Sequence, residues 1–426
     1  MSPLVFAMRL FRSALTLPLL FASSSKGESI ELRQLTPSVL HSSTVYDAII
    51  VGGGPSGLSA LSGLARVRRN VLLIDSGEYR NGPTRHTHDV IGSDGVTPAY
   101  FRWKAREQIS SYPTVSAING TVDKIDVDDT ASKGTLFSVK ATFPSGEKAT
   151  VGARKIVLAT GLRDVLPLTP GIRENWGQGI FWCLWCDGYE HADQSMGLLC
   201  DLSAVPGNVF EVETLNSDII AFVNGTDTEV ARAKASRKVP DWERFLAQRN
   251  VTIENRTIER VTRLANGSEG SGDRNPNAAT APEHDLFRVD FLEKGPSVER
   301  AAFLASFPVE QQSSLGADMG IRIDGVKLFA DQSIGLQTNI AGVYAVGDAN
   351  SDNSTNVPHA MYSGKRAAVY MHIKLSKEDI SAAVATDTLE ERTSPLDPRA
   401  VWEEMNGGST DFLDAGEFRD HLDDIS

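Results

Sequence analysis

Residues 46–60 read YDAIIVGGGPSGLSA, and this stretch decides the fold. Its first six residues form a short apolar run of the kind that becomes a buried parallel strand. The run passes directly into a GxGxxG pattern made by Gly52, Gly54 and Gly57. In this context the glycines allow a tight turn, the approach of a pyrophosphate to the backbone and close packing of the following helix. The stretch therefore predicts a strand, a turn and a helix that together bind a dinucleotide.

The residues around the fingerprint complete the expected site. Pro55 and Ser56 lie inside the turn, where the new helix offers free N–H groups and the positive end of its dipole to an anion. A second apolar strand, 70–74, ends in Asp75, whose carboxylate can accept hydrogen bonds from a ribose. The alternative is that the glycines serve only a tight turn. Here, however, the strand, the helix and the acid all occur at the spacing that a dinucleotide site requires.

Two later segments bear on which dinucleotide is bound. Residues 155–161 read KIVLATG, a buried strand that ends in a short turn. Residues 342–348 read GVYAVGD, a third strand that closes with Gly347 and Asp348, and this acid can hydrogen-bond the ribityl chain of a flavin. A helix then begins near Val357, so its N-terminal dipole could face a flavin ring. The turn residues expected to contact the cofactor are Ala159, Thr160 and Gly161.

These elements, in this order, resemble the FAD domain of the low-molecular-weight thioredoxin reductase family. The resemblance covers about residues 45–375 and implies an α/β flavoprotein with two dinucleotide-binding domains. The FAD-binding domain would be discontinuous, built from 45–167 and 307–375. The central domain, 168–306, would carry the redox residues.

A pair of cysteines lies in the stretch 181–190, which reads FWCLWCDGYE. A CxxC pair can close a small disulfide ring and, beside a flavin, can pass two electrons. CxxC followed by Asp-Gly resembles the redox motif of the same family. The resemblance implies that Cys186 makes the charge-transfer contact with the flavin, Cys183 exchanges with external thiols and Asp187 manages the proton. A structural disulfide or half of a zinc site is the alternative, although the chain has no second ligand pair and so small a ring would constrain little.

Three histidines and a third cysteine are weaker candidates. His359, near the start of the last helix, could act as a base toward an incoming thiol, because an imidazole suits that task. His86 and His88 follow the second strand and could border the flavin ring, or they could be hydrogen-bonded loop residues. Cys200 lies in an apolar run and is expected to be buried and inert.

A second nucleotide site is missing from the sequence. In reductases of this family a glycine-rich turn follows the CxxC, and two basic residues hold the NADPH phosphate one strand later. Residues 198–206 read LLCDLSAVP instead, which puts Asp201 where the pyrophosphate should bind. The strand 218–223 ends in Asn-Gly-Thr and not in a basic pair. The central domain is therefore expected to keep its shape and to have lost NADPH binding.

Without NADPH the electrons would run from external thiols through the cysteine pair and FAD to an acceptor, most simply dioxygen. The chain accordingly resembles secreted fungal FAD-dependent sulfhydryl oxidases, relatives of the dithiol oxidases of gliotoxin-type metabolites. The resemblance implies glutathione-like thiols or a dithiol metabolite as substrates, hydrogen peroxide as by-product and a homodimer. An NAD(P)H-dependent disulfide reductase is the alternative. A flavin-stabilised binding protein is a third possibility, which would leave the CxxC unexplained.

The N-terminus predicts secretion. Residues 1–25 contain no acid, carry two arginines and lead through an apolar run into Ser-Ser-Ser, which is typical of a signal peptide. A mitochondrial transit peptide is the alternative. Glycosylation sequons favour the secretory route and predict a glycoprotein. The sequons begin at Asn119, Asn224, Asn250, Asn255, Asn266 and Asn353.

Charge and composition limit the partners. Of 426 residues, 42 are Lys or Arg and 55 are Asp or Glu, so the net charge is −13. This charge argues against nucleic acid and against stable association with an anionic membrane. Three cysteines are too few for a disulfide framework or a four-sulfur metal site. Residues 376–426 are acidic and poor in apolar periodicity, so they predict a solvated tail.

Overall fold

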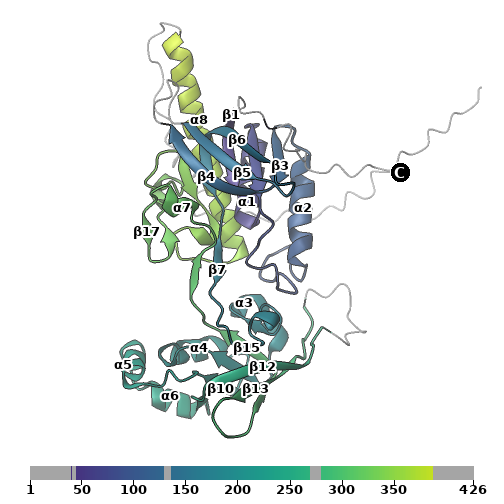
Figure 1. Ribbon diagram of the computed structural model, residues 1–426, viewed down its shortest axis with the longest axis vertical. Helices are drawn as coiled ribbons and strands as arrows, with labels where there is room; N and C mark the ends of the chain where they lie inside the picture. The colour runs from purple at the N-terminus through teal and green to yellow at the C-terminus, as the bar shows by residue number, and fades with distance from the viewer. Residues whose placement is uncertain (1–39, 41–44, 129–135, 269–279, 387–426) are drawn as a thin grey trace, which may run out of the picture.

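The computed structural model describes residues 40, 45–128, 136–268 and 280–386. The predicted signal peptide, most of the predicted acidic tail and the middle of a Gly/Ser-rich stretch lie outside these residues. Figure 1 shows the described chain as two lobes, one above the other, joined by a narrow connection near β7 (Leu162–Asp164). Each lobe is built on its own sheet.

The upper lobe contains a seven-stranded sheet in the order β3-β2-β1-β6-β5-β4, with β19 paired to β6. The strands β1, β2, β3, β6 and β19 are parallel, whereas β5 runs antiparallel to both β4 and β6. Their apolar runs are almost fully buried, as expected for parallel strands covered on both faces. The strands are β1 (Val45–Val51), β2 (Val71–Asp75), β3 (Val115–Asn119), β4 (Thr121–Asp128), β5 (Leu136–Thr142), β6 (Lys148–Leu158) and β19 (Val343–Ala345).

Two helices of the upper lobe, far apart in sequence, pack against each other. These are α1 (Pro55–Arg66) and α8 (Val357–Thr386). Glycines make the contact close: a Cβ on Gly63 would lie 2.8 Å from the Ala368 Cβ, and a Cβ on Gly364 would overlap the Ser56 carbonyl oxygen. The late segment of the chain is thereby placed over the glycine turn. The lobe also holds α2 (Pro98–Ser110), α7 (Leu315–Asp318), β17 (Ile323–Asp324) and β18 (Lys327–Leu328).

The lower lobe contains a five-stranded parallel sheet in the order β11-β10-β9-β15-β8. A three-stranded antiparallel sheet, β12-β13-β14, accompanies it. The strands are β8 (Ile180–Phe181), β9 (Met196–Leu199), β10 (Ile219–Phe222), β11 (Thr252–Glu254), β12 (Ile258–Ala265), β13 (Leu286–Phe291), β14 (Val298–Arg300) and β15 (Ala302–Ala305). The helices are α3 (Leu184–Asp187), α4 (Val205–Val212), α5 (Glu229–Lys238) and α6 (Trp242–Gln248).

The chain crosses between the lobes twice. The outgoing crossing is β7, and the returning crossing is β16 (Val309–Gln311), which pairs antiparallel with it. The sheets and their order are those of a two-domain dinucleotide-binding α/β protein. Among the described helices, none combines the length and the apolar character needed to cross a bilayer.

The end of α8 differs from the solvated tail expected from residue 376 onward. The helix continues to Thr386, and its acids at this end are paired. Lys155, which is buried on β6, donates to both oxygens of Glu378 at 2.6 and 2.8 Å, and Arg69 donates to Asp379 at 2.7 Å. These partners come from distant parts of the chain, so the charge run alone gave no sign of them.

Candidate functional site

A cavity of about 290 Å³ lies at the carboxyl ends of β1, β2 and β6, where α1 begins. This is the edge at which doubly wound sheets bind ligands. Its lining includes twelve of the residues singled out in the sequence: Gly52, Gly54, Pro55, Ser56, His86, His88, Ala159, Thr160, Gly161, Cys186, Asp187 and Asp348. The cavity therefore reaches from the glycine turn to the redox pair.

Each of the three fingerprint positions is glycine for a different structural reason. Gly52 has a φ of +106°, and a Cβ there would overlap the Ala159 carbonyl oxygen. A Cβ on Gly57 would overlap the Gly52 carbonyl oxygen, so this position closes the turn onto the helix. Gly54 has open space where its Cβ would stand, with no described heavy atom within 4 Å, and it lines the cavity. Gly54 is thus the position where a ligand can approach the backbone.

The amides at the start of α1 are available to an anion. The first N–H bonded within the helix is that of Leu58, which donates to the Gly54 carbonyl oxygen at 3.0 Å. Among the described residues, none accepts a hydrogen bond from the amides of Gly54, Ser56 or Gly57. Free amides at the positive end of a helix fit a pyrophosphate.

Asp75 does not line the cavity, although Ile74 and Ser76 beside it do. Its Oδ1 accepts hydrogen bonds from the amides of Gly53 at 3.0 Å and Gly77 at 3.1 Å. Its Oδ2 accepts from the Tyr79 hydroxyl at 2.5 Å and from Arg106. The Asp75 carboxylate therefore holds the glycine turn in place from outside the cavity lining.

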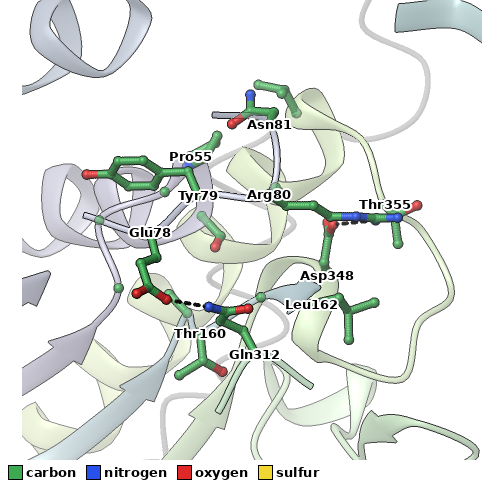
Figure 2. A pocket seen from close by; sticks show the side chains of 18 of the residues that line it. Pro55, Glu78, Tyr79, Arg80, Asn81, Thr160, Leu162, Gln312, Asp348 and Thr355 are labelled. Carbon is green, nitrogen blue, oxygen red and sulfur yellow. Dashed lines mark hydrogen bonds and ion pairs between the residues drawn. The ribbon is translucent and has the colours of Figure 1, made fainter. Parts of the chain in front are cut away.

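The loop after β2 supplies part of the cavity wall through Glu78, Tyr79, Arg80 and Asn81 (Figure 2). Arg80 donates to Asp348 at 3.0 Å and to Asp164 at 2.7 Å, and its guanidinium lies 5.4 Å from the ring centre of Trp182. Burial raises the pKa of Asp348, an effect that the charge of Arg80 opposes. Gln312, which also lines the cavity, donates to Glu78 at 2.7 Å. Sequence reasoning missed this wall, because Glu78, Arg80 and Gln312 belong to no motif and meet only in the fold.

The redox pair is a disulfide at the far end of the cavity. Cys183 and Cys186 are bonded to each other, with their Cα atoms 5.2 Å apart. Cys186 lies within the short helix α3 and lines the cavity, as does Asp187, whereas Cys183 precedes the helix and is not among the lining residues. The two sulfurs are therefore not equivalent with respect to the cavity.

The carboxyl group of Asp187 favours its protonated form. Its pKa is raised well above 3.8 by removal from solvent, then by the nearby carboxylates of Glu283 and Glu190, against the opposing charge of Arg85. A carboxylic acid held neutral beside a disulfide can give or take a proton as a thiolate forms. Cys200, by contrast, is buried, and burial raises the pKa of its thiol to about 12, as expected for an inert thiol.

Of the three candidate histidines, His86 and His88 line the cavity and His359 does not. His359 has its Nε2 2.7 Å from Asp352 Oδ2, although its neighbours Pro358 and Ala360 reach the cavity. The structure therefore brings together the two histidines of the β2 loop with the redox pair, and leaves His359 outside the lining.

A cluster of charged side chains joins the β2 loop to the lower lobe. Arg85 donates to both oxygens of Asp285, at 2.8 and 2.9 Å, and to Glu283. Arg263 donates to Asp285 as well. His191, Glu283 and Asp285 place ligand-type atoms within 4.8 Å of one another, but the two guanidinium groups already supply the positive charge there.

The carboxyl end of β9 is the place where a second dinucleotide would bind, and the amides of Leu202, Ser203 and Ala204 there are engaged within the protein. The Leu202 amide donates to Thr226 Oγ1 at 3.0 Å. The Ser203 amide donates to Asp201 Oδ1 at 2.9 Å, and the Ala204 amide to the Asp201 carbonyl oxygen at 2.8 Å. The hydrogen bond from Ser203 lowers the pKa of Asp201, so the turn carries a negative charge. This turn does not offer the free amides that the first turn offers.

The sequence matches the family model for pyridine nucleotide-disulphide oxidoreductases over residues 46–200. A probable thioredoxin reductase of Arthroderma benhamiae is 48% identical over 344 residues, which cover 80% of this chain and 82% of that protein. Thioredoxin reductase tcpT of Claviceps purpurea is 30% identical over 334 residues, covering 76% of this chain and 92% of that protein.

Solved structures agree with these matches. The crystal structure of HlmI superposes with a TM-score of 0.65 at 27% identity, covering 82% of this chain and 98% of that one. The oxidoreductase from Agrobacterium tumefaciens gives a TM-score of 0.63 at 26% identity and covers 78% of this chain and 99% of that one. The glycine turn, the redox disulfide and these relatives together show that the chain is an FAD-binding oxidoreductase and belongs to the thioredoxin reductase-like pyridine nucleotide-disulphide oxidoreductases.

Proposed function

We propose that the protein oxidises small thiols to disulfides and uses dioxygen as the final acceptor. The overall reaction is 2 RSH + O2 → RSSR + H2O2, which balances in atoms and electrons. A glutathione-like thiol or a dithiol metabolite is the proposed substrate class. The proposal rests on the position of the Cys183–Cys186 disulfide at the end of the FAD cavity, together with the engaged amides after β9.

The cysteine pair performs the exchange with the substrate. A substrate thiolate attacks Cys183 Sγ, the bond between the two cysteines breaks, and Cys186 leaves as a thiolate. A second substrate thiolate attacks the mixed disulfide, releases RSSR and leaves Cys183 reduced. Asp187, whose pKa burial raises, holds a proton beside the leaving sulfur. The free amides of Gly54 and Ser56 and the side chains of Thr160 and Asp348 would hold FAD, which supplies two-electron transfer from the dithiol to dioxygen.

The turn after β9 supports an oxidase over a reductase. A nicotinamide dinucleotide in the lower lobe would need amides for its pyrophosphate, and those of Leu202, Ser203 and Ala204 are bonded within the protein. The Asp201 carboxylate would also repel the pyrophosphate. An NAD(P)H-dependent disulfide reductase is the competing function, and the relatives reported above are named thioredoxin reductases.

Anaerobic mixing separates these functions. Glutathione or dithiothreitol should bleach the flavin band at about 450 nm, and admission of air should restore the band with formation of peroxide. NADPH at micromolar concentration should leave the band unchanged. Rapid bleaching by NADPH would establish the reductase in its place, and no bleaching by any thiol would reject the oxidase.

We also propose that the protein is secreted as a glycosylated homodimer. Five of the six sequon asparagines are exposed in the structure, and Asn266 is the exception: it is half-buried and accepts a hydrogen bond from Arg85 at 2.9 Å. Expression through a secretory host followed by endoglycosidase treatment should lower the apparent mass. Mass spectrometry that found every sequon unmodified on the secreted protein would reject the glycoprotein, and light scattering at the monomer mass would reject the dimer.

A further inference from the structure

His88 connects the redox end of the cavity to solvent through two carboxylates. It lies on the loop between β2 and α2 and lines the same cavity as Cys186 and Asp187. Its Nε2 is 3.4 Å from Glu190 Oε1 and its Nδ1 is 3.6 Å from Asp94 Oδ1. The His88 and Glu190 side chains are 9% and 6% exposed, whereas the Asp94 side chain is 40% exposed.

The loop holds this arrangement in place. The Thr87 amide donates to the Val96 carbonyl oxygen at 2.7 Å and the Gly95 amide donates back to Thr87 at 2.8 Å, which closes the loop beside His88. The Asp89 amide donates to Asp94 Oδ1 at 2.9 Å, so this carboxylate is fixed toward the imidazole. On the inner side, Thr280 donates to Glu190 Oε1.

Thiol oxidation requires protons to move at this place. Each pair of substrate thiols that becomes a disulfide gives up two protons, and the reduction of dioxygen to hydrogen peroxide takes up two. The thiols react as thiolates, so the protons leave the sulfurs before the electrons move. Asp187 can hold one proton, but it is half-buried among other acids and needs a partner that exchanges with water.

We propose that His88 is that partner: it carries protons between the redox end of the cavity and solvent, receiving them on the Glu190 side and passing them to Asp94. The inference rests on the proposed thiol oxidation. An imidazole suits the role because its two nitrogens can take up a proton on one side and release it on the other. No atoms are exchanged other than the proton, which Asp94 delivers to water.

The neighbouring charges define the environment of this path. Glu190 and Asp94 face the two nitrogens of His88. After burial, the carboxylates of Glu283 and Glu190, which come from two different segments, raise the pKa of Asp187, and the charge of Arg85 lowers it. His86, whose ring centre is 6.0 Å from that of His88, faces Glu283 with Nδ1 3.5 Å from Oε1. Glu283 forms an ion pair with Arg85, and its side chain is 7% exposed, so a proton path through His86 would end inside the protein.

The test compares His88→Gln with His284→Gln, which makes the same change at an exposed histidine of the lower lobe. Flavin reduction by dithiothreitol near neutral pH should slow by about 100-fold in His88→Gln and stay unchanged in His284→Gln. Added imidazole should restore much of the loss, because a small base replaces the missing one. Equal rates in the two variants, or a loss that imidazole does not relieve, would overturn the proposal.

A second measurement does not depend on thiol oxidation. The apoprotein is reduced with a phosphine, and the alkylation rate of Cys183 and Cys186 by iodoacetamide is followed against pH. Alkylation reports the fraction of each cysteine that is a thiolate. In His88→Gln this fraction, and with it the rate at neutral pH, should fall several-fold, because the imidazole no longer accepts a thiol proton. The curves should converge at high pH, where hydroxide deprotonates the thiols of both proteins. Superimposable curves would overturn the role of His88. A wild-type protein that thiols fail to bleach, but whose alkylation curve shifts in the variant, would reject the oxidase alone.

Asp94→Asn keeps the loop and tests the outer end of the path. Reduction by dithiothreitol should slow by about 10-fold, and an increase in buffer concentration should relieve the loss. An Asp94→Asn protein as fast as wild type at every buffer concentration would place the exit elsewhere and overturn the stated route.

Discussion

At the scale of single residues, the two cysteines of the disulfide face different surroundings. Cys186 lines the FAD cavity and Cys183 does not. We therefore expect Cys183→Ser to leave a thiolate against the oxidised flavin and to show a long-wavelength charge-transfer band. Cys186→Ser should lack this band, and both variants should lose turnover by about 10³-fold or more because the pair acts as a unit. Absorbance spectra and steady-state rates check this, and a band found only in Cys186→Ser would reverse the assignment.

Gly54 offers a second test at this scale. Its backbone has φ of −71° and its Cβ position is open, so a side chain there causes no strain in the apoprotein. Gly54→Leu should therefore fold with nearly unchanged apoprotein stability but fail to retain FAD, because the side chain fills the pyrophosphate position. Gly57→Ala is the contrasting variant, and its Cβ overlap should cost about 1–3 kcal/mol of unfolding free energy. Flavin content and melting of the apoproteins distinguish the two.

Asp187 should make stability depend on pH. Its pKa is raised from 3.8 by burial, so the folded protein binds this proton more tightly than the unfolded chain does. The free energy of unfolding therefore falls as the pH rises from about 3.8 through the folded pKa. Asp187→Asn stays neutral, so its stability relative to wild type should increase across that window. Urea unfolding at a series of pH values measures the difference, and parallel curves for the two proteins would contradict it.

The sequence predicted most of the residues at the cofactor end of the site. Gly52, Gly54 and Gly57 form one local pattern that can be recognised in the sequence, although only Gly57 is constrained by a sequence neighbour, the Gly52 carbonyl oxygen, whereas the atom that a Cβ on Gly52 would overlap belongs to Ala159. His88 belongs to no such pattern, and its proposed role depends on Glu190, an acid 102 residues later in the other lobe. Asp75 was predicted to meet a ribose, but the Tyr79 and Arg106 contacts that surround it come from the fold.

At the scale of elements, α8 shows where composition stops being informative. The segment from residue 376 onward is acidic as a whole, which favours a solvated tail, yet Glu378 at its start meets the buried Lys155 of β6. Glu378→Gln should leave that ammonium without a counter-charge and cost about 3 kcal/mol of unfolding free energy. Burial already lowers the pKa of Lys155, so the loss should be smaller at alkaline pH. Asp379→Asn, at a more exposed acid of the same turn, is the control and should cost under about 1 kcal/mol.

The strands, in contrast, were predictable from local pattern. The runs 46–51, 70–74 and 155–158 are mostly apolar and correspond to β1, β2 and the end of β6, since parallel strands in this sheet are covered on both faces. The β4-β5 hairpin that extends the sheet was not expected, because no motif marks it.

At the scale of the whole molecule, the two lobes are joined by the β7 and β16 crossings and by the Arg85 cluster. Arg85→Met should leave Glu283 and Asp285 partly uncompensated and cost about 3 kcal/mol or more of unfolding free energy. Arg163→Met removes an exposed ion pair on β7 itself and should cost under about 1 kcal/mol. Hydrogen exchange should also increase in 80–88 and 283–285 of Arg85→Met. Unchanged exchange there would show that the crossings alone fix the lobes.

The turn after β9 has an evolutionary consequence. Its three amides are satisfied by two residues from different segments, Asp201 and Thr226. Removal of either one leaves a backbone donor unpaired before any nucleotide can take its place, and such a donor costs about 1–3 kcal/mol. A single substitution of Asp201 or Thr226 therefore lowers stability and brings no gain in ligand affinity. If the proposed oxidase function holds, the acquisition of nicotinamide binding at this turn would therefore require several simultaneous changes.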